Sequence, residues 1–121
     1  MSTPPVISYP QETKKSDKRM RAYLSGPISG QVDLNRPAFA EAQAALEAVG
    51  YEVVNPFDVA GEETDWERCM ELDLAALETC DIMAQLDHWP QSRGARIENH
   101  KAYRLSIPTA HWRVWVREAQ A

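Results

Sequence analysis

The sequence predicts an α/β fold in which helices cover both faces of a parallel sheet. Four short apolar segments are typical of strands, at residues 20–25, 51–54, 80–86 and 107–110. Three longer segments with helical periodicity separate them, and the connections are short. Right-handed crossovers in such a sheet place the loops that follow the strands at one edge, where ligands bind.

At 121 residues, the chain has enough length for one domain with a single core. Residues 1–19 contain three prolines and a basic run without apolar periodicity, so we expect a flexible tail followed by a domain over residues 20–121. The chain shows neither a membrane span nor a secretory signal, which predicts a cytoplasmic location. Cys69 and Cys80 fit reduced thiols better than a disulfide or a zinc site.

Charge is distributed unevenly along a chain whose net charge is −5. Thirteen acids and two bases lie between Asp33 and Asp81, whereas six bases and a single acid, Glu98, lie between Arg93 and Arg117. The net charge argues against a nucleic-acid binder. The basic final third indicates an anionic ligand or, alternatively, a solvated basic face.

The first helix is expected to begin at Asn35, with its side chain as the cap and Pro37 in the first turn, and to stop at Gly50. Its apolar stripe is Phe39, Ala42, Leu46 and Val49. Residues 57–65 have no periodicity and predict an acidic loop. The turn at residues 26–30 is either a tight structural turn or a ligand loop.

Each of the next two helices places a carboxylate on its inward face. Asp73 falls within the stripe formed by Trp66, Met70, Leu74 and Leu77, and Glu98 falls within the stripe formed by Ala95, Ala102 and Leu105. An unpaired buried charge is costly, so carboxylates at such positions indicate function. For Asp73 the alternative is a structural one, either a cap or an ion pair with an arginine.

The helix that carries Glu98 starts with Ser92, Arg93 and Gly94, directly after a strand and a polar turn. Free N–H groups at such a helix start bind anions, so these residues suit a phosphate or a sugar hydroxyl. The basic residues nearest to Glu98 along this helix are Arg93, Arg96 and Lys101. They and the helix start predict an ionised Glu98.

Two carboxyl groups in one cleft can divide the roles of nucleophile and acid. An ionised Glu98 suits attack on an oxocarbenium-like sugar carbon, and Asp73, in a more apolar setting, suits a proton donor. The sequence lacks the glycine fingerprint of a dehydrogenase and the motif of a serine or cysteine hydrolase. The three histidines are too scattered for a metal site, so no metal and no cofactor are expected.

Five segments, in this order and spacing, resemble the nucleoside 2-deoxyribosyltransferase-like superfamily, in particular its small phage and bacterial branch. They are YLSGPI (23–28), NRPAF (35–39), YEVVNP (51–56), DLAALETCDIM (73–83) and SRGARIE (92–98). The similarity covers about residues 20–110. It implies a flavodoxin-like or Rossmann-like three-layer sandwich with a parallel sheet of four to five strands.

The resemblance also implies cleavage or transfer at the N-glycosidic bond of (deoxy)nucleosides or their 5′-monophosphates, through a covalent glycosyl-glutamate. Glu98 corresponds to the nucleophile, Asp73 to a residue that positions the base and its proton, and Tyr23 to a residue that contacts the sugar and the nucleophile. Further substrate contacts are expected from Ser25, Gly26, Ile28, Asn55, Ser92, Arg93 and Gly94, with Ser92 favouring a nucleotide.

The expected partner is therefore a small nucleoside or nucleotide, with a homo-oligomer (dimer or tetramer) implied by the resemblance and with no nucleic-acid polymer or membrane. Residues 111–121 fit an edge strand, a short helix or an oligomer contact. A non-catalytic nucleotide-binding or sensing module of the same fold is the alternative function. A purely structural interaction protein is a third hypothesis, and it leaves the two inward carboxylates unexplained.

Overall fold

A parallel sheet forms the middle layer of the protein. The computed structural model describes residues 19–121, so the tail predicted for residues 1–19 lies, except for Arg19, outside the described residues. Within them the strands are β1 (Arg21–Ser25), β2 (Glu52–Val54), β3 (Ile82–Gln85) and β4 (Thr109–His111). Their order is β2-β1-β3-β4, and every pairing is parallel.

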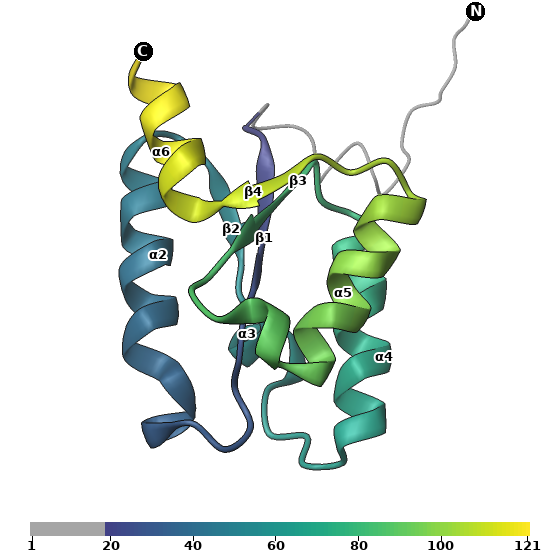
Figure 1. The fold of residues 1–121 in the computed structure, drawn as a ribbon. Coiled ribbons are helices and arrows are strands. Elements are labelled where there is room, and N and C mark those ends of the chain that lie inside the picture. The colour runs from purple at the N-terminus through teal and green to yellow at the C-terminus, as the bar shows by residue number, and fades with distance from the viewer. Residues whose placement is uncertain (1–18) are drawn as a thin grey trace, which may run out of the picture.

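Helices cover both faces of this sheet (Figure 1). The helices α2 (Arg36–Ala48) and α6 (Trp112–Gln120) lie on one side, and α4 (Trp66–Leu77) and α5 (Arg93–Arg104) lie on the other. The short α3 (Pro56–Ala60) and two 3-10 turns, η2 (Val32–Asn35) and η3 (Trp89–Gln91), occupy connections. The predicted α/β three-layer architecture is confirmed.

The alternation of side chains along β1 divides the core into two layers. Ala22 and Leu24 pack in the cluster that contains Phe39 of α2 and Trp112 of α6. Tyr23 packs in the cluster on the other face, which includes apolar residues of α4 and α5. Because successive strand residues point to opposite faces, Ser25 points to the same side as Tyr23, toward α4 and α5.

The start of α2 differs from the sequence prediction. Asn35 adopts a left-handed conformation with φ 65°, and its side chain caps no helix N–H group. The Asn35 Nδ2 group instead donates a hydrogen bond of 2.9 Å to the carbonyl of Pro27, which fastens the turn after β1 to the start of α2. The predicted capping role is therefore wrong, although Pro37 does lie in the first turn.

The acidic segment after β2 is not entirely a loop, because α3 occupies its first part. Asn55 Oδ1 accepts a hydrogen bond of 2.9 Å from the N–H group of Phe57, and Pro56 stands at the first helical position. An asparagine cap followed by proline is a common way to begin a helix. The Asn55-Pro56 pair is therefore a helix-start signal in the sequence, but the five-residue helix that follows is too short to show periodicity.

Two expectations for the last third of the chain are also decided by the structure. Residues from Trp112 onward form α6, and the indole N–H of Trp115 donates to the carbonyl of Met83 at 2.8 Å. Leu105, expected on the buried stripe of α5, is 46% exposed because it follows the last helical residue, Arg104.

In residues 19–121 no helix has the length and apolarity that a membrane crossing requires.

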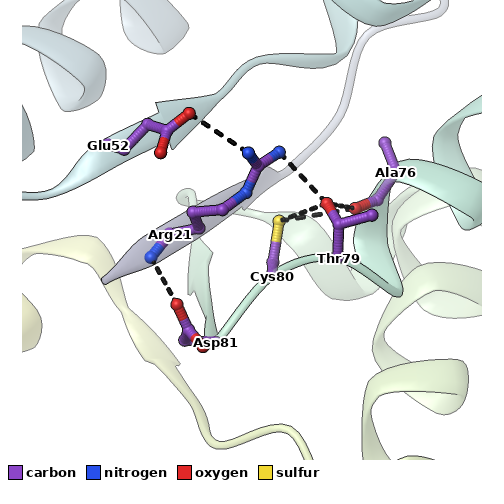
Figure 2. Close-up of polar contacts among 6 residues, drawn as sticks. All are labelled: Arg21, Glu52, Ala76, Thr79, Cys80 and Asp81. Carbon is purple, nitrogen blue, oxygen red and sulfur yellow. Dashed lines mark hydrogen bonds and ion pairs between the residues drawn. The ribbon is translucent and has the colours of Figure 1, made fainter. Parts of the chain in front are cut away.

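A cluster centred on Arg21 closes the amino edge of the sheet (Figure 2). The Arg21 guanidinium contacts Glu52 Oε2 and the Thr79 hydroxyl oxygen, each at 3.1 Å. The backbone N–H of Arg21 donates to Asp81 Oδ2 at 2.7 Å, and Cys80 lies beside the cluster as a buried free thiol. These contacts join β1, β2 and the segment that leads into β3.

Candidate functional site

A cavity of about 720 Å³ lies at the carboxyl edge of the sheet, within the size range of small-molecule sites. The segments that follow β1, β2 and β3 all contribute to it, which confirms the predicted convergence of these loops. Its wall includes Gly26 after β1, Phe57 after β2 and Ser92 after β3. Asp73 and Glu98 both line it, so the two inward carboxylates share one cavity as the sequence predicts.

Glu98 lies at the buried end of the site and is 5% exposed. Its carboxylate accepts hydrogen bonds from the Tyr23 hydroxyl at 2.8 Å and from the Ser25 hydroxyl at 2.7 Å. Both donors come from the face of β1 that α5 covers. The pKa of Glu98 is raised to about 8, mainly by burial and in smaller part by the charge of Asp73, although the hydrogen bonds from Ser25 and Tyr23 favour the ionised form.

The prediction that basic neighbours hold Glu98 ionised is wrong. The Arg93 guanidinium lies over the Trp66 ring, 4.5 Å from its centroid. Arg96 donates to the carbonyl of Pro90, and Lys101 pairs with Glu78. Arg96 lies two residues before Glu98 and so points from a different face of the helix, whereas Lys101, three residues after it, is drawn to Glu78 instead.

Asp73 is 6% exposed and sits between the buried side chains of Met70 and Leu77 on α4. Its Oδ1 atom is buried and has no hydrogen-bond partner within residues 19–121. Burial raises the pKa of Asp73 to about 7. Within the described chain the carboxylate forms no ion pair with an arginine, so the structural alternative of an arginine partner is not observed.

The start of α5 forms another part of the cavity wall. Ser92 caps this helix, since its hydroxyl oxygen accepts a hydrogen bond of 3.1 Å from the N–H group of Ala95. Gly94 permits α5 to approach α4 closely, because an added Cβ would lie 3.3 Å from the sulfur of Met70. Gly26 is needed for the same reason after β1, where a Cβ would lie 2.7 Å from that of Leu86.

The predicted site residues fall into two groups, with Asn55 outside both. Gly26, Ile28, Ser92, Arg93 and Gly94 line the cavity with Asp73 and Glu98. Tyr23 and Ser25 instead contact Glu98 from the sheet side, and both are completely buried. The Asn55 side chain turns away to cap α3 and to donate to Gln43 Oε1 at 2.9 Å. The roles of all these residues in substrate binding or catalysis remain predictions.

Three further residues of the cavity were not predicted from the sequence: the second arginine, Arg36, and the aromatic residues Phe57 and Trp66. The Arg36 guanidinium lies 4.6 Å from the centroid of the Phe57 ring, in the same way that Arg93 lies over Trp66. All four residues line the cavity. Arg36 is one of only two bases in the acidic stretch from Asp33 to Asp81, which is the signal that could have marked it.

The described residues also limit which groups the site could hold. In residues 19–121 no three or more His, Cys, Asp or Glu side chains are grouped so that they could hold a metal ion. The buried carboxyl groups of the cavity are those of Asp73 and Glu98, and its arginines are Arg36 and Arg93; the exposed Glu63 also contributes to the wall.

These features define an α/β protein with a parallel sheet and a two-carboxylate cavity at the carboxyl edge of that sheet. The chain belongs to the family described as "Domain of unknown function (DUF4406)", which matches residues 20–110. No match to the chain is found among curated proteins.

Proposed function

We propose that this protein cleaves or transfers the N-glycosidic bond of (deoxy)nucleosides or nucleoside 5′-monophosphates. The observation that carries the proposal is the joint position of Asp73 and Glu98 in one cavity, with Glu98 held by two hydroxyl donors. The resemblance of the sequence to the nucleoside 2-deoxyribosyltransferase-like superfamily supports the same chemistry. A cytoplasmic location and a homo-oligomer, which the sequence and its resemblance predict, belong to this proposal.

In the proposed reaction a carboxylate oxygen of Glu98 attacks the anomeric carbon of the sugar. The bond between that carbon and the base nitrogen breaks, its electron pair leaves with the base, and the base takes a proton from Asp73. Water or a second base then displaces Glu98 from the glycosyl ester, and Asp73 recovers a proton from the incoming nucleophile. Tyr23 and Ser25 hold Glu98 in position throughout.

The raised pKa values of the two carboxyl groups determine how much of the protein is in the reactive form. With pKa values of about 7 for Asp73 and about 8 for Glu98, the pair carries one shared proton in the interval between them, mainly on Glu98. The reactive form, with that proton on Asp73 and Glu98 ionised, is therefore the less populated of the two singly protonated forms. Turnover should therefore follow a bell-shaped pH profile with its maximum between the two values.

The positive groups of the cavity favour a phosphorylated substrate. Arg36 and Arg93 line the cavity, and each is held over an aromatic ring with donors left for an anion. The Ser92 hydroxyl and the start of α5 add further donors nearby. A 5′-monophosphate would meet these groups while its sugar lies against Glu98.

A screen for released base tests the proposal. The protein is incubated with the common nucleosides, deoxynucleosides and their 5′-monophosphates, and free base is measured by chromatography. We expect release from at least one deoxynucleoside monophosphate, with Glu98→Ala lowering it by at least 10⁴-fold, on the order of the effect of removing a catalytic nucleophile. Glu71→Ala, which removes an exposed glutamate of α4, is the matched control and should keep full activity.

The result that contradicts the proposal is an absence of base release from every substrate in this screen. A second function, nucleotide binding without turnover, is favoured by one observation: the raised pKa of Glu98 leaves it largely protonated at neutral pH, which weakens a nucleophile. That function predicts ligand-dependent thermal stabilisation that persists in Glu98→Gln while no product forms.

A further inference from the structure

A line of hydrogen bonds leads from Glu98 along the sheet side of α5. Ser25 donates to Glu98 Oε1 at 2.7 Å, and the Ser25 oxygen accepts a hydrogen bond of 3.2 Å from Asn99 Nδ2. Asn99 Oδ1 in turn accepts a hydrogen bond of 2.7 Å from Gln85 Nε2. The same Asn99 Nδ2 group also donates to the carbonyl of Ala95 at 2.8 Å.

The direction of these hydrogen bonds is fixed by the chemistry of the amide groups. The Asn99 Nδ2 group has two N–H donors, and the Ser25 oxygen and the Ala95 carbonyl take both of them. Gln85 fixes the orientation of this amide, because it donates to Asn99 Oδ1. Asn99 therefore presents a donor and no acceptor to Ser25. The single hydroxyl proton of Ser25 is left to Glu98.

The sequence builds this arrangement from three separate elements. Ser25 and Gln85 are the last residues of β1 and β3 and are paired in the sheet register. Asn99 lies in the middle of α5, where asparagine is less favourable than most helix-forming residues. Its bond to the carbonyl four residues earlier is a known way for a polar side chain to remain within a helix.

We infer that Asn99 and Gln85 are positioning residues that direct the Ser25 hydroxyl proton onto Glu98 and thereby stabilise its ionised form. The inference rests on the proposed function for its catalytic meaning, because a nucleophile must be ionised. The titratable groups that act on Glu98 are Tyr23 from β1 and Asp73 from α4, and neither is part of this line. The charged side chains of Glu63, Arg36 and Arg93 also line the cavity.

Reversing the polarity at one position tests the inference. Asn99→Asp has nearly the same shape but presents an acceptor, so the Ser25 proton should turn from Glu98 to the new carboxylate. The titration midpoint of Glu98 is followed by NMR of ¹³C-labelled glutamate carboxyls, with its signal assigned by its loss in Glu98→Gln. Asn99→Asp is introduced both into the protein with Ser25 and into a Ser25→Ala background. We expect the rise in the Glu98 midpoint to be larger by about one pH unit when Ser25 is present, which is the effect of one hydrogen-bond donor.

The Ser25→Ala background separates the hydrogen bond from simple charge repulsion, because a through-space effect does not need the hydroxyl. His100→Asp, which adds a carboxylate at the next and exposed position of α5, is the matched control and should shift the midpoint equally in both backgrounds. Gln85→Met, a neutral change, should raise the midpoint in the same direction by a smaller amount. Equal shifts for Asn99→Asp with and without the Ser25 hydroxyl would overturn the inference.

A second readout connects the line of hydrogen bonds to catalysis. In the base-release assay, Asn99→Asp should lower kcat at neutral pH with little change in KM, and should move the limb of the pH profile that reports the ionisation of Glu98 to higher pH. The NMR titration needs no turnover, so it decides the inference even if the protein releases no base. If base is released but the pH profile of Asn99→Asp matches that of the unmodified protein, the positioning role is refuted while the proposed function stands.

Discussion

Both edges of the sheet contain charged side chains, but within residues 19–121 these side chains are paired at the amino edge, whereas the buried carboxylates of the carboxyl edge have no partner of opposite charge. At the amino edge, the Arg21 guanidinium meets Glu52 and Thr79, and Asp81 accepts the N–H of the same arginine (Figure 2). At the carboxyl edge, Asp73 and Glu98 share a cavity in which neither carboxylate pairs with a cation within the described chain.

The difference shows which edge is arranged for stability. Within residues 19–121, most polar atoms at the amino edge find partners, and the two buried side-chain atoms there that lack one, Arg21 Nε and Glu52 Oε1, belong to groups that are paired through their other atoms. At the carboxyl edge burial raises the pKa values of both carboxyl groups, which means that their ionised forms destabilise the fold. A protein keeps such groups where they serve a function.

The largest expected effect concerns Glu98 and pH. Its folded pKa of about 8 lies above the ordinary value of 4.5, so the folded state binds more protons than the unfolded state between these values. The contribution of Glu98 to stability is therefore complete below about pH 4.5 and is lost as pH rises toward 8. Glu98→Gln removes this loss, and should be more stable than the unmodified protein at pH 8 by roughly 4 kcal/mol.

Urea unfolding at pH 5 and pH 8 measures this prediction. The stabilisation by Glu98→Gln should nearly vanish at pH 5, where Glu98 is protonated in the folded protein. Glu71→Gln, at an exposed position of α4, should show no such dependence. A stability difference between Glu98→Gln and the unmodified protein that is equal at both pH values would show that Glu98 does not titrate as its burial implies.

A smaller effect is expected at the opposite edge from Arg21→Met. The substitution leaves Glu52 without its cation and Thr79 without a donor, and should lower the free energy of unfolding by about 2 kcal/mol at pH 7. Arg68→Met, which breaks an exposed pair with Glu71, is the matched control and should cost less than about 0.5 kcal/mol. Chemical denaturation of both variants gives the comparison. Equal losses would mean that the Arg21 cluster adds no more than a surface ion pair.

The sequence predicts the carboxylates of the carboxyl edge but not the paired charges of the amino edge. Periodicity predicts the strands, the long helices and the inward positions of Asp73 and Glu98, because a residue's face follows from its helical angle. It does not predict α3, which is too short to show a period and depends on the Asn55 cap. Nor does it predict the Arg21 cluster, whose members lie up to 60 residues apart.

The electrostatic environment of Glu98 cannot be predicted from its neighbours in sequence. Three basic residues lie close to Glu98 on its own helix, yet they contact Trp66, Pro90 and Glu78 instead. The groups that do hold Glu98, Tyr23 and Ser25, come from a strand more than 70 residues earlier. The resemblance already implied the contact between Tyr23 and Glu98, and the structure confirms it, whereas the contact of Ser25 depends on the packing of β1 against α5, which no sequence pattern defines.

The cations of the carboxyl edge provide the smallest and most selective prediction. Arg36 and Arg93 each stand over an aromatic ring, and Arg36 has only a long, exposed contact with Asp33 at 3.9 Å, so both guanidinium groups can still bind a ligand. If they bind phosphate, Arg93→Gln should weaken binding of a deoxynucleoside 5′-monophosphate about tenfold and leave the matching nucleoside unaffected, a difference of roughly 1.4 kcal/mol. Arg36→Gln should act in the same direction, and Arg68→Gln, outside the cavity, should change neither affinity. Calorimetric titration of both ligands decides the point, because equal weakening of nucleoside and nucleotide would show that the arginines shape the cavity instead of binding phosphate.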